Sequence, residues 1–327
     1  MTAPDAEPSL PSQRAAWLAL IALTLLWSLN WSVMKVAMDY SGPLVFSAQR
    51  YVLGTVTLFI ALAFRRPATG RLPWRPTIVI GLTQTAGFQA LAQLALVRGG
   101  AGKVALLAYT MPFWVVPLAW WWLHERPGAV RWICIALAAA GFICIVSPWQ
   151  GIGEPRSIAL AVSAGLSWAV ATVVSKRLFE QHPTVTPLQL TAWQMLVGTA
   201  VLVMLALAEP GRPVHWTATY VWALLYNGVL SSGLCWLLWA LIVQRLSANV
   251  SGMTSLAVPT AGVLFAWALL KERPSQAEWI GIGLIGIALV QLNFTQRVAR
   301  RAPRASEGDA GVRLRAYPRH SAGRRQS

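Results

Sequence analysis

Residues 109 to 127 read YTMPFWVVPLAWWWLHERP, and residues 256 to 274 read LAVPTAGVLFAWALLKERP. At a shift of 147 residues, both stretches place a proline inside an apolar run, then a tryptophan, then the triplet Glu-Arg-Pro. Chance similarity between two regions rich in Leu and Ala does not explain matched tryptophans, prolines and a contiguous triplet. The chain therefore contains an internal duplication.

The duplication extends on both sides of these stretches. The same shift superposes Gly81 on Gly228, Ala101 on Ala248 and Trp132 on Trp279. Earlier in each half the shift is smaller, 144 residues at Gly54 and 141 residues at Trp27. Connections of different length between the repeated segments explain the smaller shift.

The composition is that of a membrane protein. Of the 327 residues, 56% are hydrophobic and only 12% are charged, whereas about a quarter of a soluble protein is charged. The charges leave nine uncharged runs and a tenth that contains only Arg50. Because a helix needs about 20 apolar residues to cross the hydrocarbon core, we expect an all-α membrane protein with ten transmembrane helices, at 15–34, 43–64, 76–97, 104–123, 132–153, 157–175, 183–208, 213–244, 246–270 and 279–296.

An odd number of spans in each copy fixes the relation between the copies. Two five-helix units in one chain enter the membrane from opposite sides, so we expect two inverted five-helix repeats related by a pseudo-twofold axis in the membrane plane. This architecture is typical of alternating-access carriers. The expected limits are a cytoplasmic N-terminal tail at 1–14, a first repeat at 15–147, a linker at 148–156, a second repeat at 157–295 and a basic, disordered cytoplasmic tail at 296–327.

Lysine and arginine are more frequent on the side of the membrane that carries both chain ends. The last 32 residues, 296 to 327, hold nine arginines against Glu307 and Asp309. By the positive-inside rule, both termini are expected in the cytoplasm. A basic tail can also bind nucleic acid, but retention on the cytoplasmic face is the commoner cause on a polytopic chain, so we expect no nucleic-acid partner.

No catalytic site, metal site or cofactor is expected. The three cysteines, Cys134, Cys144 and Cys235, lie inside predicted spans, where they act as small apolar residues rather than as a disulfide framework or a zinc site. None of the four histidines lies in the middle of a span. The sequence therefore offers no base for an intramembrane serine hydrolase and no His-ligated metal site.

Several short motifs resemble those of a known family. They are the segment WSLNW at residues 27 to 31 with Lys35, the segment YTMP at residues 109 to 112 before an aromatic-rich helix, and the Glu-Arg-Pro triplets that begin at Glu125 and Glu272. Over residues 15 to 295 the chain resembles the EamA-type permeases of the drug/metabolite transporter superfamily. The resemblance implies a ten-helix inner-membrane carrier, often an exporter of amino acids or other metabolites, and leaves the substrate open.

Polar side chains inside the predicted spans mark the faces that avoid lipid, because hydrocarbon cannot satisfy them. They recur at helical spacing and, together with deep aromatic residues, are expected to surround a substrate cavity. An alternative is that the Ser, Thr and Gln residues only hydrogen-bond neighbouring helices. The candidate substrate-binding residues are Trp27, Asn30, Arg50, Thr85, Gln89, Gln93, Tyr109, Trp168, Gln194, Asn227, Ser231, Trp236 and Ser255.

Arg50 is the most informative of these positions. An arginine inside a span costs about 2.5 to 3.5 kcal/mol on insertion scales unless it is paired or hydrated. Its counterpart in the second repeat is Gln194, so the two halves differ chemically at this point. Arg50 is expected to bind a substrate carboxylate or phosphate or to lock helices through carbonyl groups; alternatively, it reaches the membrane interface where its span begins.

The acidic residues restrict the class of substrate. All eleven Asp and Glu residues fall in tails, connections or span ends. Proton-coupled export of cationic drugs generally uses a buried carboxylate, so cationic cargo is disfavoured. A neutral, zwitterionic or anionic metabolite fits the sequence better.

Two matched pairs of residues are candidates for helix breaks or gates. Pro112 and Pro259 interrupt predicted helices at equivalent points inside the membrane, which frees carbonyl groups and permits bending. Glu125 and Glu272 each precede Arg-Pro, and the simplest interpretation is a turn that places an acid near a helix N-terminus. A gate pair at opposite membrane faces is the alternative.

The sequence therefore favours an inner-membrane exporter of a small metabolite such as an amino acid. Its partners would be that small molecule and the lipid bilayer; a monomer is sufficient, and a homodimer is compatible with the fold. A flippase or carrier for a lipid-linked sugar or a nucleotide sugar is the first alternative, which would need more than one cationic contact to phosphate. A membrane enzyme or sensor is the non-transport alternative.

Overall fold

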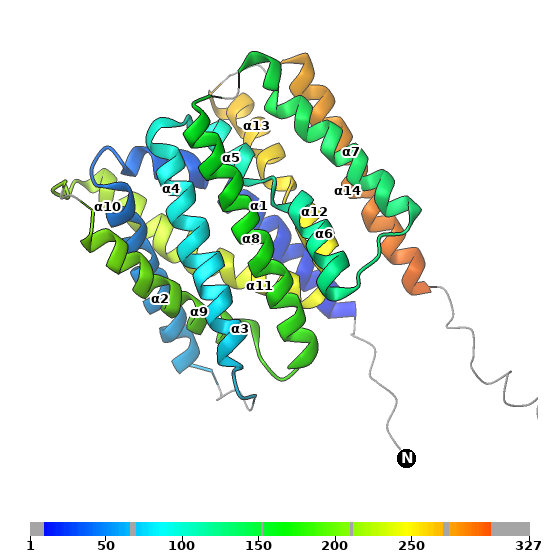
Figure 1. Cartoon of the computed structure of the whole chain (residues 1–327), viewed down its shortest axis with the longest axis horizontal. Coiled ribbons are helices and arrows are strands. Elements are labelled where there is room, and N and C mark those ends of the chain that lie inside the picture. Colours follow the sequence, from blue (N-terminus) through cyan, green and yellow to red (C-terminus); the bar gives the residue numbers. More distant parts are fainter. Residues whose placement is uncertain (1–9, 66–69, 152, 210–211, 271–274, 302–327) are drawn as a thin grey trace, which may run out of the picture.

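A computed structural model describes residues 10–65, 70–151, 153–209, 212–270 and 275–301. Within these ranges the chain forms helices joined by short connections and contains no strand (Figure 1). The first half contains α1 (Leu10–Ala37), α2 (Pro43–Ala63), α3 (Trp74–Ile80), η1 (Gly81–Gly87), α4 (Phe88–Arg98), α5 (Ala101–Ala108), α6 (Met111–Leu123) and α7 (Ala129–Val146). After the short η2 (Pro148–Gln150), the second half contains α8 (Pro155–Gln181), α9 (Pro187–Leu207), α10 (Ala218–Leu225), η3 (Tyr226–Leu234), α11 (Cys235–Arg245), α12 (Ala248–Thr254), α13 (Ala257–Leu270) and α14 (Gln276–Arg301).

The expected all-α membrane fold is confirmed. Eight segments in the described residues are long and apolar enough to cross a membrane: Leu18–Ala37, Pro43–Ala63, Trp74–Arg98, Gly102–Leu123, Ala129–Val146, Pro155–Gln181, Pro187–Leu207 and Ala218–Arg245. The ninth expected span is divided between α12 and α13, and the apolar part of α14, Gln276–Leu292, is shorter. The number of ten membrane crossings therefore stays a prediction.

Local sequence explains where several helices begin. Pro43 and Pro187 each stand in the first turn of a helix, where the missing N–H of proline removes no hydrogen bond. Glu154 precedes α8, and its carboxylate accepts a hydrogen bond from the backbone N–H of Ser157 at 2.8 Å. This bond holds the pKa of Glu154 below its ordinary value.

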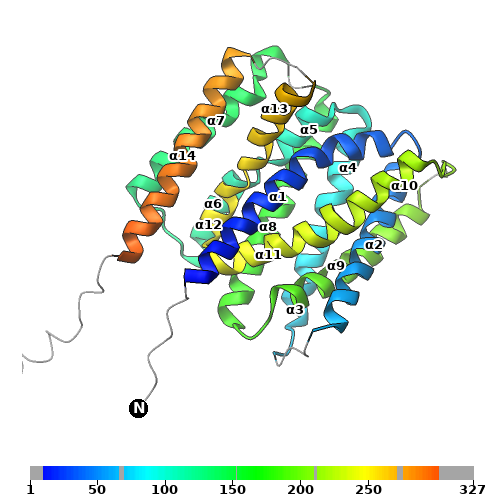
Figure 2. The same ribbon diagram turned by 180° about the vertical axis from the view of Figure 1, so that it is seen from behind.

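The contacts between helices follow a twofold exchange of the two halves. Helix α2 packs against its counterpart α9, and α7 packs against its counterpart α14. Helix α1 contacts α11, and in the equivalent contact α8 packs against α4. Each half therefore buries its faces mainly against the other half, and the two repeats form one body (Figures 1 and 2).

Paired helices of the two repeats run in opposite directions. The ring of Phe59 lies 5.1 Å from the ring of Trp193, whereas the hydroxyl of Thr199, further along α9, donates to the carbonyl of Tyr51, earlier in α2. Helices α7 and α14 are also antiparallel, and the start of α1 lies at the same end of the molecule as the end of α14 (Figures 1 and 2). This arrangement is that of inverted repeats.

Irregular helical segments occur at equivalent places in the two repeats. The π-helical segments η1 and η3 interrupt the third and eighth spans around Gly81 and Gly228. The fourth span breaks at Tyr109, just before Pro112, and the ninth breaks at Ser255, just before Pro259. Since π-helical turns and proline breaks leave regular hydrogen bonding unmade, they mark the places where these spans bend most easily.

Glycines allow the two repeats to touch through their backbones. A Cβ atom on Gly54 would lie 2.9 Å from the carbonyl oxygen of Gly228, and a Cβ atom on Gly198 would lie 2.4 Å from the carbonyl oxygen of Gly81. These are equivalent contacts under the duplication. Any larger residue at these positions must push α2 away from η3, or α9 away from η1.

Two carboxylates cap helices that begin far away in the sequence. Glu209 accepts hydrogen bonds from the backbone N–H groups of Leu44 and Val45 at the start of α2, at 3.0 and 3.1 Å. Glu125 accepts from the backbone N–H groups of Ala248 and Asn249 at the start of α12, at 2.9 and 3.2 Å, and from the Asn249 side chain at 2.8 Å. Glu125 therefore links the two repeats rather than only shaping its own turn. Glu272 lies outside the described residues.

Substitution of Gly198 tests the close approach of the repeats. A Cβ atom on Gly198 would also lie 2.3 Å from the Cβ atom of Thr85, so we expect Gly198→Ala to reduce the free energy of unfolding by about 1–3 kcal/mol. Gly283→Ala is the matched control, because a Cβ atom on Gly283 meets nothing within 4 Å. Thermal unfolding of the purified proteins in detergent measures both; equal melting temperatures would contradict the proposed backbone contact.

Removal of the Glu125 carboxylate tests the link to α12. Loss of a helix cap costs about 0.5–2 kcal/mol, so Glu125→Ala should lower the melting temperature measurably. Glu180→Ala serves as the control, because the carboxylate of Glu180 is half exposed and lies 3.6 Å from the Lys176 ammonium in a surface pair that contributes little. A loss of stability no larger than that of the control would show that the cap does not stabilise the fold.

Candidate substrate-binding site

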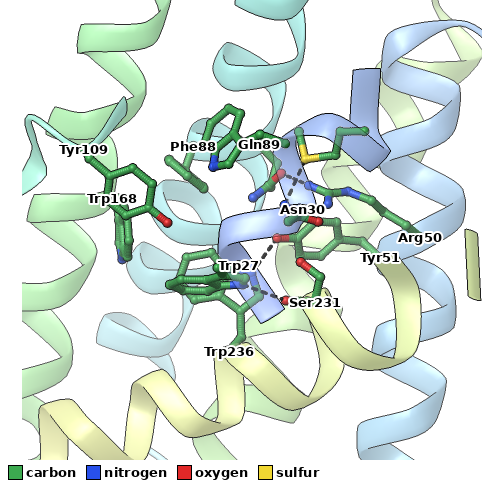
Figure 3. A pocket seen from close by; sticks show the side chains of 12 residues that line it. Trp27, Asn30, Arg50, Tyr51, Phe88, Gln89, Tyr109, Trp168, Ser231 and Trp236 are labelled. Atoms are coloured by element: carbon green, nitrogen blue, oxygen red, sulfur yellow. Dashed lines mark hydrogen bonds between the residues drawn. The ribbon is translucent and has the colours of Figure 1, made fainter. Parts of the chain in front are cut away.

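Residues from six spans surround a small cavity (Figure 3). Its volume of about 20 Å³ is room for about one water molecule. The helices α1, α2, α4, α8 and α11, the segment η3 and the break after α5 contribute to its wall. The lining residues are Trp27, Asn30, Trp31, Met34, Arg50, Tyr51, Phe88, Gln89, Tyr109, Trp168, Ser231 and Trp236.

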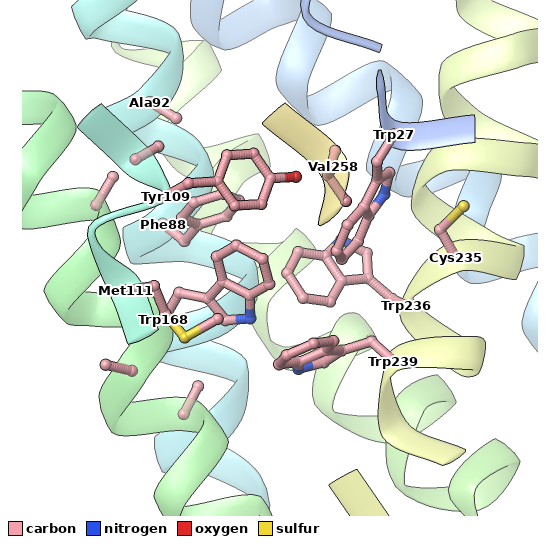
Figure 4. Close-up of a cluster of buried hydrophobic side chains, with 14 of the residues drawn as sticks. Trp27, Phe88, Ala92, Tyr109, Met111, Trp168, Cys235, Trp236, Trp239 and Val258 are labelled. Carbon is pink, nitrogen blue, oxygen red and sulfur yellow. The ribbon is translucent and has the colours of Figure 1, made fainter. Parts of the chain in front are cut away.

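One side of the cavity is an aromatic cluster (Figure 4). The ring of Trp27 lies 5.5 Å from that of Trp168 and 4.9 Å from that of Trp236, both in edge-to-face geometry. The rings of Phe88 and Tyr109 lie 5.1 and 5.6 Å from Trp168. Such contacts hold large rings in fixed positions. The two repeats therefore build a common apolar wall, with Trp168 at its centre.

The opposite side carries the buried guanidinium of Arg50, which is only 1% exposed. Its Nη1 donates to Oδ1 of Asn227 at 2.8 Å, and its Nη2 donates to Oε1 of Gln89. The rings of Phe46 and Tyr51 lie 5.9 and 5.0 Å from the guanidinium carbon. No ion pair to Arg50 occurs among the described residues, so its charge faces neutral amides and aromatic rings.

The Arg50 side chain lies inside the helix bundle. The side chain turns inward to partners on α4 and η3 instead of extending along its own helix. The Nε atom of Arg50 is buried without a hydrogen-bond partner. Because buried N–H groups are almost always paired, this atom is a candidate contact for a ligand or a water molecule.

Other polar groups of the pocket are partly satisfied by the protein. The indole N–H of Trp27 donates to the carbonyl of Ser231 at 3.1 Å, and the indole N–H of Trp236 donates to the hydroxyl of Tyr51 at 2.6 Å. Oδ1 of Asn30 and the indole N–H of Trp168 are buried without a partner. The cavity thus offers an acceptor and a donor besides the guanidinium.

Eight of the thirteen residues that the sequence indicated as substrate-binding line this cavity. Thr85 and Gln194 instead hydrogen-bond each other at 2.9 Å between η1 and α9. Asn227 contacts the cavity only through Arg50, and Ser255 donates to the carbonyl of Gly252 in its own segment. Both side-chain polar atoms of Gln93 are buried without a partner. The described side chains of the ninth span, which was expected to line the cavity, do not contribute to its wall.

Four lining residues were not among those indicated: Trp31, Met34, Tyr51 and Phe88. Trp31 and Met34 continue the face of α1 that carries Trp27 and Asn30. Tyr51 and Phe88 each adjoin a polar lining residue in the sequence. Apolar side chains do not distinguish a pocket wall from a lipid-facing or packed surface, so only this proximity could have indicated them.

Comparison with known proteins identifies the family. The profile of the EamA-like transporter family matches residues 14–147 and 155–294, once for each repeat. A crystal structure with 20% sequence identity superposes with a TM-score of 0.72 and covers 88% of this chain and 99% of its own, which shows the same fold.

Relatives with functional names include two that differ in cargo. The probable terminal-alkyne amino-acid exporter of Streptantibioticus cattleyicolor is 28% identical over 302 residues, covering 90% of this chain and 98% of that protein. The riboflavin transporter of Rhizobium johnstonii is 29% identical over 289 residues, covering 85% and 90%. The chain belongs to the EamA-like transporter family and is a multi-pass membrane protein.

Proposed function

We propose that this protein exports a small neutral, zwitterionic or anionic metabolite, such as an amino acid, across the inner membrane by alternating access. Both termini lie in the cytoplasm in this proposal, and the substrate binds in the cavity between Arg50 and the aromatic cluster. The protein acts on one small molecule within the lipid bilayer, and a monomer suffices.

The observation that carries the proposal is a buried cation beside an aromatic wall. A carboxylate is among the strongest partners of a guanidinium, and the faces of Trp27, Trp168 and Trp236 suit an apolar body or an ammonium group. The wall comes from both repeats, so a molecule held there contacts both moving halves. This is the position that alternating access requires of a substrate.

The cavity must enlarge before it accepts a metabolite, because its volume of about 20 Å³ admits about one water molecule. Two sets of side-chain hydrogen bonds outside the cavity wall also join the repeats. In one set the Tyr220 hydroxyl hydrogen-bonds Ser41 at 3.1 Å and also Gln49. In the other the Gln189 amide donates to the carbonyl of Gly70 at 3.1 Å. In this proposal the two sets break one at a time as the cavity opens to one side or the other.

The names of the relatives support transport and leave the cargo open. One is named for an amino acid and the other for riboflavin, so the substrate panel has to include both kinds of compound. Carriage of a lipid-linked sugar or nucleotide sugar is less well supported. A diphosphate would favour several cationic contacts, and Arg50 is the one cation among the described residues that line the cavity. A membrane enzyme or sensor, the non-transport alternative, would show no flux of intact substrate.

Flux through reconstituted protein tests the function and the site together. In proteoliposomes loaded with labelled amino acids or riboflavin, we expect the wild type to release at least one compound. Arg50→Ala should reduce that flux by about tenfold or more, because losing a hydrogen bond to a charged group costs about 1.5–3 kcal/mol. Gln89→Ala should reduce it less.

Gln194→Ala is the matched control for this experiment. Gln194 stands at the position of the second repeat that corresponds to Arg50, is equally buried, and binds Thr85 instead of the cavity. It should retain most of the wild-type flux in protein that elutes as a single gel-filtration peak. Unchanged flux in both Arg50→Ala and Gln89→Ala would remove the proposed site, and absence of any flux in the wild type would remove the proposed substrates.

A further inference from the structure

The two amide partners of Arg50 differ in their relation to the cavity. Gln89 lines the cavity, on α4 of the first repeat (Figure 3). Asn227 stands behind, on η3 of the second repeat, and its own side-chain N–H donates to the carbonyl of Ala223 at 3.0 Å. A molecule in the cavity therefore meets the Gln89 side of the guanidinium, while Asn227 is held by its own helix.

The present partners leave the guanidinium short of interactions. Arg50 has five N–H donors, and its hydrogen bonds within the described residues go to two neutral amide oxygens. Its Nε has none. Hydrogen bonds to a charged acceptor are roughly twice as strong as bonds to a neutral one, and a buried charge without a counter-charge is costly. A carboxylate within reach would therefore compete well against an amide.

We propose that Oε1 of Gln89 occupies the place that a substrate carboxylate takes, so that carboxylate binding breaks the bond between Arg50 and Gln89 and removes this hydrogen-bond link between α4 and α2. This inference rests on the proposed function, because it gives that site its substrate class: small carboxylates with an apolar or aromatic body. Asn227 keeps the guanidinium in position during the exchange of partners.

The exchange would act where the third span bends. Helix α4 continues directly from the π-helical segment η1, and π-helical turns occur frequently at functional sites. The guanidinium of Arg50, on α2, makes two side-chain hydrogen bonds within the described residues. One goes to Gln89 on α4, in the third span, and the other goes to Asn227 on η3, in the eighth span. Loss of the Gln89 bond would leave Arg50 attached to the second repeat alone, which changes how the third span is held.

Thermal unfolding with a small carboxylate tests this exchange without knowledge of the physiological cargo. The probe is sodium benzoate, a carboxylate on one aromatic ring, and the neutral benzamide is its control at equal concentration and ionic strength. The purified full chain in detergent should melt at a higher temperature with benzoate and not with benzamide, because a ligand that binds the folded state stabilises it. Arg50→Ala should lose the benzoate shift.

Gln89→Glu places a permanent carboxylate at the proposed position. This variant should melt above the wild type without any ligand, because it pairs a buried charge, and it should show no benzoate shift. Gln93→Glu is the matched control: it adds the same acid one helical turn away, where the Gln93 side chain is fully buried and has no partner. It should lower the melting temperature and keep the benzoate shift.

Each result bears on the proposal. A benzoate shift of equal size in Gln89→Glu and the wild type, or its absence from the wild type, overturns it. If Gln89→Glu does not fold, Gln89→Ala decides: removing the competing amide should lower the benzoate concentration at the titration midpoint, and an unchanged or higher midpoint overturns the proposal. Failure of this proposal can be distinguished from failure of the proposed function. Flux can persist when benzoate does not give the expected melting shifts, and the expected shifts can appear in protein that shows no flux.

Discussion

Hydrocarbon offers no partner to a polar group, and this constraint organises the whole molecule. Helix ends receive side chains from distant segments: Glu125 accepts from the first N–H groups of α12 in addition to that helix's own Ser247 cap, and Lys35 donates to the carbonyls of Leu96 and Gly99 at the end of α4, at 2.6 and 3.2 Å. The same constraint turns the Arg50 guanidinium inward. Two of these contacts, from Glu125 to the start of α12 and from Arg50 to Asn227, also join the two repeats.

The scaffold is symmetric at its irregular helical segments and asymmetric at the candidate binding site. The glycine contacts, the π-helical segments and the helix breaks at Pro112 and Pro259 occur in both repeats. Arg50 and Gln194, by contrast, occupy equivalent positions and do different things: one faces the cavity and the other pairs with Thr85. Equivalent bending points suit two conformations of similar energy, whereas a single cation gives a substrate one orientation in both.

The sequence predicted the helices well because apolar runs have few alternatives. The run 43–64 corresponds to α2 at Pro43–Ala63, and the matched prolines lie in the first turn of the helix that follows each observed break. Side-chain roles were harder to predict. Gln194 and Gln89 carry the same amide group and both are buried, yet only Gln89 lines the cavity. The difference comes from the helix that each side chain faces. Glu125 suggested a local turn because its partner, α12, lies in the other repeat and is remote in sequence.

In the proposed transport cycle, the charge of the site would make enclosing the empty cavity and enclosing the loaded cavity differ in free energy. An unloaded cavity keeps an uncompensated guanidinium in a medium of low dielectric constant, where isolated charges are costly. A carboxylate at Arg50 would make the loaded cavity neutral, and a neutral cavity is cheaper to enclose. Closure around a loaded site is then favoured over closure around an empty one. A single arginine without a neighbouring acid can in this way couple cargo binding to conformational change without a second ion.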